Sequence, residues 1–171
     1  MTPPITQELC MVRNVMIYDN DTGRFPVRKH PRLKEYDYTT ENYYFVTLCT
    51  RNKERLFGDA ENLSPIGKTA ESCLREIPKH FCNVVLDKYV VMPNHIHAIV
   101  ILPGKTANLS VVIGQYKAAV TKQLHKTFPK LSLWQTSFHD HVIRSQEDYE
   151  RIWAYIEGNP SKWTEDCFYM P

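Results

Sequence analysis

The 171-residue chain lacks the features that mark several common classes of protein. Its five cysteines are scattered and none belongs to a Cys-x-x-Cys pair, which argues against a disulfide framework or a zinc ribbon and fits a reducing compartment. No apolar stretch reaches the roughly 18 residues that a membrane span needs, and the first ten residues lack the apolar segment of a secretory signal. We therefore expect a cytoplasmic protein with one domain and no membrane partner.

Carboxylates are missing from a long stretch of the chain. No aspartate or glutamate occurs from Lys88 to His139, although six lysines fall there, and residues 24–34 carry five basic side chains without an acid. A stretch of one sign creates a positive field that suits a polyanion such as a nucleic acid. The alternative is a solvated lysine face whose acidic neighbours come from elsewhere in the fold.

The spacing of apolar residues predicts an α+β fold. Strands are expected where β-branched and aromatic residues are frequent, at 43–50, 83–92, 95–102 and 136–144. Helices are expected where apolar residues recur three and four positions apart, at 65–80, 108–128 and 145–157. The resulting order β-α-β-β-α-β plus a C-terminal helix is that of a ferredoxin-like antiparallel sheet with helices on one face.

The first part of the chain does not share this periodicity. Residues 1–42 mix proline, polar and basic residues, which indicates an irregular basic arm ahead of a single domain over residues 43–171.

Two histidines stand one residue apart in the apolar segment "VVMPNHIHAIVIL" (90–102). Residues i and i+2 of a strand point to the same face, with Cα atoms roughly 6.5–7 Å apart, so we expect His95 and His97 side by side and Ile96, Ala98 and Val100 on the other face. Two imidazoles so placed can bind one metal ion. The alternative is a pair of core histidines satisfied by hydrogen bonds, and a metal site needs at least one more ligand.

The last predicted helix offers further polar groups. Its expected buried stripe is formed by Tyr149, Ile152, Trp153 and Ile156. Tyr155 and Asn159 lie one turn apart on a flank of that stripe, so a phenol and an amide face the same patch of space. The alternative is a boundary tyrosine beside the core and an asparagine that ends the helix before proline.

Together these segments resemble a known family. The ordered set "YDYTTENYYFVTLCT", "VVMPNHIHAIVIL", "IGQYKAAVTKQL" and "LWQTSFHDHVIRSQEDYERIWAYIEGNPSKW" is similar to the REP-associated tyrosine transposases, single-tyrosine relatives of insertion-sequence transposases. His95-Ile96-His97 resembles the His-hydrophobic-His signature of HUH nucleases. The resemblance covers about residues 30–166. It implies that Tyr155 is the nucleophile, that His95 and His97 are metal ligands, and that Asn159 is the third protein ligand.

The same resemblance implies an activity. The chain would be a metal-dependent single-stranded DNA endonuclease and strand transferase, transposase-like, acting on repeat hairpins through a covalent 5′-phosphotyrosine. The expected cofactor is a divalent metal, Mg²⁺ or Mn²⁺. The expected partner is single-stranded DNA with a hairpin of the repetitive extragenic palindrome type. Relatives include dimers and monomers, so the sequence is compatible with a homodimer.

Basic and aromatic residues outside this site are expected to contact DNA. Those on the second helix would meet phosphates, and those in the arm combine charge with a ring for stacking on bases. They are Arg28, Lys29, Arg32, Lys34, Tyr36, Lys117, Lys122, Lys126 and Arg144. The alternatives are a disordered basic tail for the arm and a salt-bridge role for Arg144.

Three other functions compete with this one, and the sequence disfavours the first of them. A histidine-triad nucleotide hydrolase would need a third alternating histidine, and position 99 is isoleucine. A domesticated protein of the same fold could bind DNA hairpins without cutting them. A metalloregulatory protein has no sign in its favour beyond the two histidines. If Tyr155 is not the nucleophile, Tyr149 and Tyr116 are the next candidates.

Overall fold

A computed structural model describes residues 42–102, 104 and 107–169 of the protein. Its central sheet is antiparallel, with the strand order β4-β5-β1-β6. The strands are β1 (Asn42–Cys49), β4 (Val85–Met92), β5 (His95–Leu102) and β6 (His139–Ile143). This is the ferredoxin-like topology that the order of predicted elements indicated, and the α+β prediction is confirmed. The predicted arm lies outside the described residues except for Asn42.

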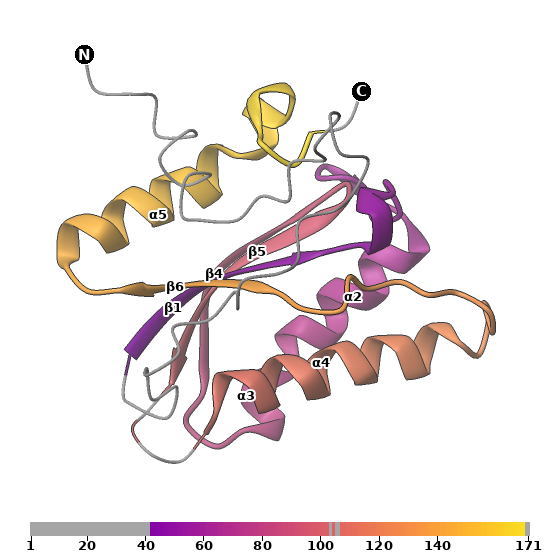
Figure 1. The fold of residues 1–171 in the computed structure, drawn as a ribbon, viewed down its shortest axis with the longest axis horizontal. Coiled ribbons are helices and arrows are strands. Elements are labelled where there is room, and N and C mark those ends of the chain that lie inside the picture. Colours follow the sequence, from indigo (N-terminus) through magenta and orange to yellow (C-terminus); the bar gives the residue numbers. More distant parts are fainter. Residues whose placement is uncertain (1–41, 103, 105–106, 170–171) are drawn as a thin grey trace, which may run out of the picture.

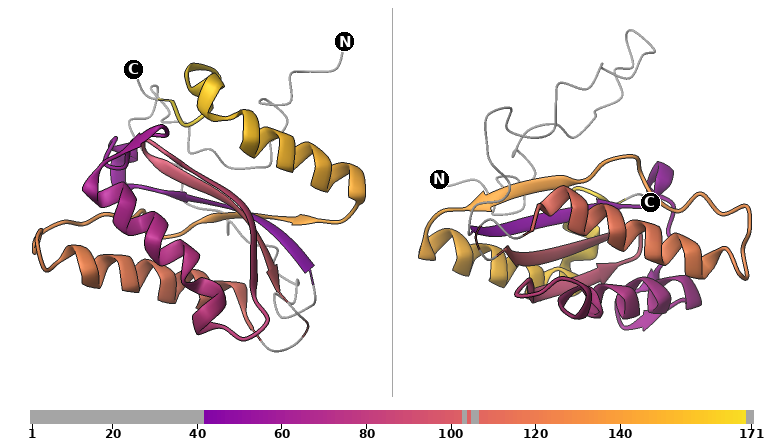
Figure 2. Two further views of the ribbon diagram at one scale, coloured as in Figure 1. Left: turned by 180° about the vertical axis from the view of Figure 1, so that it is seen from behind. Right: turned by 90° about the horizontal axis from the view of Figure 1, so that it is seen from below.

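Helices cover both faces of the sheet. The two crossover helices, α2 (Pro65–Arg75) and α4 (Leu109–Leu124), pack on one face, and the last helix, α5 (Gln146–Gly158), lies across the other (Figures 1 and 2). We call the first the core face and the second the site face. Among the described residues, no helix is long and apolar enough to cross a membrane.

Local sequence signals explain where the helices begin. Ser64 accepts a hydrogen bond from Gly67 N at the start of α2, where Pro65 occupies the first turn. Ser145 accepts from Asp148 N in the same way at the start of α5. These two starts agree with the prediction.

The predicted helix over residues 65–80 is wrong as one continuous helix. It consists of α2, which ends at Arg75, and a separate short helix α3 (Ile77–His80). Pro78 explains the break, because proline lacks an N–H and its ring obstructs the helix one turn before it.

Short elements also form outside the predicted helices and strands. These are the 3₁₀ helix η1 (Arg51–Lys53), the hairpin strands β2 (Gly58–Asp59) and β3 (Asn62–Leu63), and the 3₁₀ helix η3 (Pro160–Glu165). Phe57, directly ahead of the hairpin, packs tightly on α2, since a Cβ atom at Gly67 would lie 2.2 Å from the Phe57 carbonyl oxygen. Both 3₁₀ segments flank the site described below.

Alternate residues of β5 divide between the two faces. Ile96, Ala98 and Val100 are buried in the main hydrophobic cluster with α2 and α4. Ile99 belongs to a smaller cluster on the site face, together with Phe45 of β1, Ile143 of β6, and Ile152 and Ile156 of α5. The same alternation sends His95 and His97 to the site face, as predicted.

Candidate functional site

The two histidines of β5 form the centre of the site. Both are fully buried, with His95 0% and His97 1% exposed. Their Nε2 atoms lie 2.9 Å apart, a distance at which one of the two nitrogens carries the proton that the other accepts. The rings meet nearly edge to face, with centroids 4.4 Å apart. The two imidazoles therefore converge on one point, as their i, i+2 spacing predicted.

A fixed partner holds the other nitrogen of His95. The Asn94 amide nitrogen donates to two backbone carbonyls, those of Lys53 and Phe168, so its oxygen faces His95 Nδ1 at 2.8 Å. His95 Nδ1 therefore carries the proton, and its Nε2 presents a lone pair to the site. Burial, and after it the charge of His97, holds the pKa of His95 well below 6.5, which keeps the ring neutral.

His97 has an equivalent partner on the neighbouring strand. Its Nδ1 lies 2.9 Å from the Thr47 hydroxyl, which can either donate or accept a hydrogen bond. Thr47 is paired directly with His97 across the β1–β5 ladder. The ring also stacks on Phe45 at a centroid distance of 5.1 Å. Such partners orient a metal-binding imidazole and select its tautomer.

Helix α5 brings Tyr155 to the histidines. The Tyr155 hydroxyl oxygen lies 3.3 Å from His97 Nε2 and donates a hydrogen bond to Asp166 Oδ2 at 3.0 Å. Burial and the nearby Asp166 carboxylate raise the pKa of Tyr155 far above its usual value. The phenol is thus protonated at neutral pH and needs a cation or a base to become a nucleophile.

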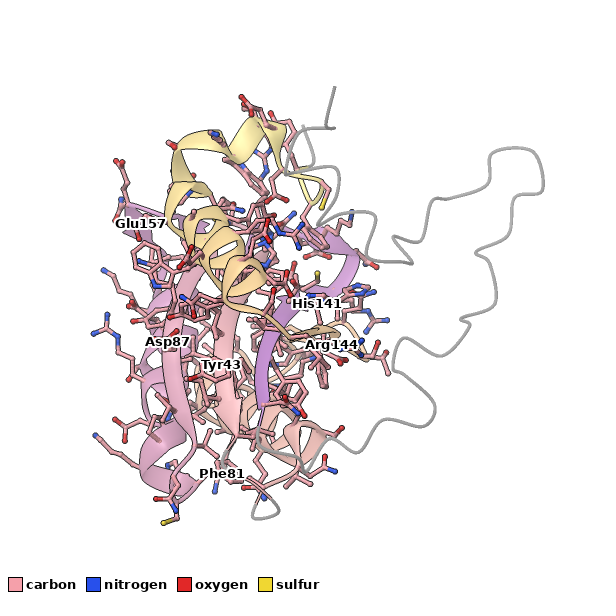
Figure 3. The ribbon with its side chains drawn as sticks, turned by 90° about the vertical axis from the view of Figure 1, so that its left-hand side faces the viewer. Tyr43, Phe81, Asp87, His141, Arg144 and Glu157 are labelled. Atoms are coloured by element: carbon pink, nitrogen blue, oxygen red, sulfur yellow. The ribbon has the colours of Figure 1, made fainter. Side chains whose placement is uncertain are left out.

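Tyr149 and Tyr116, the alternative candidates for the nucleophile, have hydroxyl groups that bind partners other than the histidines. The Tyr149 hydroxyl donates to Asp87 Oδ2 at 2.6 Å, a hydrogen bond that, with burial, raises the pKa of Tyr149 to about 12. Asp87 lies on β4, on the flank of α5 opposite to His141 (Figure 3). The Tyr116 hydroxyl donates to the Ala70 carbonyl inside the core face. Of the three tyrosines, Tyr155 is the one beside an imidazole.

Asp166 is a site residue that the sequence analysis missed. It follows η3, is 5% exposed, and its Oδ2 lies 3.9 Å from the Nε2 atoms of both histidines. Burial alone would raise the pKa of Asp166, but the interaction with His97, the neighbouring His95 ring and the Phe168 backbone N–H together hold it well below its usual value. The Phe168 N–H donates to Oδ1, so Oδ2 is the oxygen that faces the site.

Asn159 lies beside Asp166 at the end of α5. Its amide nitrogen donates to Asp166 Oδ2 at 2.9 Å, and its amide oxygen is buried without a hydrogen-bond partner. A buried carbonyl oxygen without a donor costs free energy unless something else satisfies it. A cation would do so.

The donor set fits a divalent metal ion. The ligand atoms of His95, His97 and Asp166 all lie within 4.8 Å of one another, and all three side chains are buried. Two imidazole nitrogens and a carboxylate oxygen are a common set for divalent ions at catalytic sites. The side chain of Asn159 is linked to this group, since its amide nitrogen donates to Asp166, and its buried amide oxygen is a ligand atom of the kind that hard cations prefer.

The predicted DNA contacts lie in three places. Lys117 and Lys122 are on α4, which packs on the core face, and Lys126 lies just beyond the end of that helix (Figure 1). The Lys117 ammonium donates to the carbonyls of Gln135 and Ser137, so it supports the fold there. Lys117 and Lys122 also line an open groove of about 600 Å³ between α4 and Trp134.

The remaining predicted DNA contacts are Arg144 and five residues of the arm. Arg144 is exposed just ahead of α5, on the flank shown with His141 in Figure 3, and makes no ion pair with any described residue. Its salt-bridge alternative thus finds no partner within the described part of the chain. Arg28, Lys29, Arg32, Lys34 and Tyr36 lie outside the described residues.

One residue of the predicted buried stripe on α5 is misplaced. Trp153 is 39% exposed, and the Lys88 ammonium lies 4.0 Å from its ring centroid. The helix turns about 100° per residue, so a buried arc centred on Ile152 and Ile156 that also takes in Asn159 leaves Trp153 at its outer edge. The buried side of α5 thus includes Asn159 and leaves out Trp153.

Comparison with known proteins gives one family and several relatives. Residues 38–159 match the family described as "Transposase IS200 like". An uncharacterized protein of Haemophilus influenzae is 32% identical over 168 residues, covering 84% of this chain and 93% of that protein. The REP-associated tyrosine transposase of Escherichia coli is 32% identical over 77 residues, covering 45% of this chain and 44% of that protein.

A solved structure shares the fold. It is a REP-associated tyrosine transposase bound to a REP hairpin, with a TM-score of 0.58 and 24% sequence identity, and the match covers 77% of this chain and 74% of that one. The matched family segment begins ahead of β1 and ends at Asn159. It therefore includes both histidines and Tyr155 but not Asp166.

Proposed function

This chain belongs to the IS200-like transposase family, and from that premise we propose that it is a metal-dependent single-stranded DNA endonuclease and strand transferase that works through a covalent bond to Tyr155. The observation that carries the proposal is the position of the Tyr155 hydroxyl, 3.3 Å from His97 Nε2, at a group of buried side chains that could hold a metal ion. Tyr155 reaches this point from α5 and the histidine from β5, so two separate elements of the fold converge there.

In the proposed reaction Tyr155 is the nucleophile and Asp166 is the partner of its proton. The Tyr155 oxygen attacks the phosphorus of a DNA phosphodiester, the bond from phosphorus to the 3′-oxygen breaks, and a 5′-phosphotyrosine and a 3′-hydroxyl result. The proton of the attacking phenol leaves along its hydrogen bond to Asp166 Oδ2, at 3.0 Å, and the departing 3′-oxygen takes up one proton to become the hydroxyl. The phosphotyrosine ester keeps the energy of the original bond, so a second 3′-hydroxyl can reverse the reaction and join a new strand.

Four side chains would hold the metal ion. His95 and His97 offer nitrogen ligands, Asn159 is the oxygen ligand implied by resemblance, and Asp166 is a second oxygen ligand suggested by its distance from both imidazoles. When bound, a divalent ion polarises the phosphate and offsets the charge that develops on its oxygens. Two oxygen donors favour Mg²⁺ or Mn²⁺ over softer ions.

The substrate we propose is single-stranded DNA that carries a hairpin. The support is the similarity to a transposase whose structure holds a REP hairpin, together with the carboxylate-free stretch from Lys88 to His139. The setting would be the bacterial cytoplasm, where chromosomal DNA lies, and a homodimer is compatible with this proposal. Lys122, Lys126 and Arg144 stay proposed contacts of the phosphate backbone.

The test is formation of a covalent protein–DNA adduct. Labelled single-stranded hairpin oligonucleotides, drawn from repeats near the gene, are incubated with protein and Mn²⁺ and separated on a denaturing gel. We expect an adduct that chelator and the Tyr155→Phe substitution abolish and that Tyr149→Phe, the matched control on the same helix, leaves intact. Full duplex DNA should give none. Tight hairpin binding without any adduct would instead support the non-cutting hairpin-binding protein.

A further inference from the structure

The loop that follows β1 is hydrogen-bonded to the turn directly ahead of His95. Thr50 N donates to the Asn94 carbonyl at 2.9 Å, and Phe57 N donates to the Pro93 carbonyl at 3.0 Å. The Asn94 side chain, which orients His95, also donates to the Lys53 carbonyl at 3.2 Å. The loop over residues 50–57 is thus positioned by the same asparagine as the metal-binding imidazole.

Two cations of this loop lie over aromatic rings beside the histidines. The Lys53 ammonium is 5.3 Å from the centroid of Phe168, whose ring is 4.7 Å from that of His95. The Arg55 guanidinium is 5.1 Å from the centroid of Tyr169 and 5.8 Å from that of Trp163. Trp163 in turn lies 5.8 Å from the His95 ring. Each cation therefore contacts a ring that itself lies against His95.

An aromatic ring holds a cation without cancelling its charge. Lys79 and Lys88 pair with carboxylates elsewhere in the protein, whereas no described carboxylate lies within 4.0 Å of the Lys53 ammonium. Its positive charge thus stays available to an anion that enters the site.

The backbone at Asn52 and Lys53 has an unusual conformation. Asn52 and Lys53 both have φ of 55°, the left-handed region that side chains other than glycine rarely adopt. Two such residues in succession are costly, and backbone strain of this kind is concentrated at functional sites. In this loop the conformation brings the Lys53 carbonyl to Asn94 and its ammonium to Phe168.

We propose that Lys53 and Arg55 bind phosphates of single-stranded DNA where the strand reaches the histidines, Lys53 at the phosphate nearest to them and Arg55 at a neighbouring one. The inference rests on the proposed function and deepens it by giving the path of the substrate strand. The α4 lysines cannot serve this purpose, because they lie across the sheet, and Lys117 is engaged by two carbonyls. A phosphodiester matches these cations in charge, and the guanidinium can bind its two oxygens together.

The experiment measures the affinity of a single-stranded hairpin oligonucleotide as a function of salt, with chelator present and in the Tyr155→Phe background so that no cleavage occurs. Lys53→Gln and Arg55→Gln should each weaken binding roughly three- to tenfold at 0.1 M salt and lower the salt slope by about 0.7, the value for one phosphate on a single strand. Lys68→Gln on α2, which removes the same charge from an exposed site on the core face, should change neither. Lys53→Arg should restore most of the affinity.

A second measurement probes the contact from the DNA side with Lys53 present. Neutral methylphosphonates are placed at one phosphate at a time, and one position should reproduce the Lys53→Gln loss and have no further effect in that variant. Wild-type affinity and slope in Lys53→Gln, or an equal loss in Lys68→Gln, would overturn the inference while leaving the proposed function intact. Failure of the unsubstituted protein to bind single-stranded DNA would overturn both.

Discussion

The two faces of the sheet use the same strands for different purposes. On the core face, Ile96, Ala98 and Val100 of β5 are buried against α2 and α4. On the site face, His95 and His97 of the same strand are equally buried but meet polar side chains from α5 and from the segment after η3. Burial is the same on both faces, so burial alone does not separate a residue that stabilises the fold from one that performs chemistry.

Hydrogen bonds are what make the polar face compatible with burial. Each imidazole has a fixed partner for its outer nitrogen, Asn94 for His95 and Thr47 for His97, while both inner nitrogens face one another. Without such partners, a buried polar group would cost roughly 1–3 kcal/mol. The comparison predicts that substitutions on the site face change metal binding and catalysis, whereas those on the core face change stability.

The largest effect is expected from removing a histidine of the site face. His95→Ala or His97→Ala should weaken Mn²⁺ binding by more than the roughly 10–100-fold that loss of an outer-shell partner costs, and should abolish the DNA adduct. Titration of bound Mn²⁺ by electron paramagnetic resonance measures this directly. His125→Ala, directly after the last residue of α4, is the matched control and should bind Mn²⁺ normally. Normal Mn²⁺ binding by both site variants would refute the metal assignment.

The next effect is expected on the core face, one residue away. Ile96→Ala should lower the free energy of unfolding by about 2–5 kcal/mol, because it removes a fully buried side chain and leaves a cavity. Chemical denaturation with urea measures the loss. The Mn²⁺ affinity of the folded variant should stay within about twofold of wild type. A large drop in affinity without loss of stability would contradict the division between the faces.

The pH dependence of the free energy of unfolding also distinguishes the two faces, because the buried His95 lies on the site face. The pKa of His95 in the folded protein lies well below 6.5, so at pH 5 the unfolded chain binds more protons than the folded one, and stability falls as the pH drops below 6.5. The slope from this group is at most about 1.4 kcal/mol per pH unit. Asp166, whose pKa is also lowered, loses its contribution only below about pH 4.

The measurement is urea unfolding at pH 7 and pH 5 with chelator. His95→Ala should reduce the loss of stability between these pH values, and Ile96→Val on the core face should not. Equal losses in wild type and His95→Ala would show that His95 is protonated as readily in the folded chain as in the unfolded one.

The smallest effect is expected from an outer partner. Thr47→Val keeps the shape of the side chain but removes the hydroxyl 2.9 Å from His97 Nδ1, and should weaken Mn²⁺ binding by about tenfold. Thr69→Val, which removes a hydroxyl that donates to the Pro65 carbonyl on α2, is the control and should leave affinity unchanged. Unchanged affinity in Thr47→Val would mean that His97 needs no fixed tautomer to bind the ion.

Periodicity explains which of these features could be predicted from the sequence. The strand alternation places His95 and His97 on one face, and helical spacing places Tyr155 and Asn159 together, because both follow from regular backbone geometry. Asp166 follows Pro160 in an irregular segment, where spacing says nothing about direction. Its one signal was a carboxylate among aromatic residues in "KWTEDCFYM".

The charged residues show a second limit of sequence reasoning. The lysine-rich stretch suggested DNA contacts on α4, but a sequence does not reveal which cations already bind backbone carbonyls, as Lys117 does. Conversely, Lys53 and Arg55 lie between the predicted strand at 43–50 and the predicted helix at 65–80, where no element or site was expected. Their relevance came from three-dimensional contacts with rings around His95. Trp153 was misjudged, since the buried side of α5 includes Asn159 and leaves Trp153 out.

The central claim is that Tyr155 becomes covalently attached to DNA at the buried histidines. The most direct test is to cleave a single-stranded hairpin oligonucleotide with the protein and Mn²⁺, digest the adduct with trypsin and nuclease, and locate the nucleotide by mass spectrometry. The account predicts a 5′-phosphotyrosine on the tryptic peptide that contains Tyr155. Attachment at Tyr149, at Tyr116 or at any other residue would contradict it.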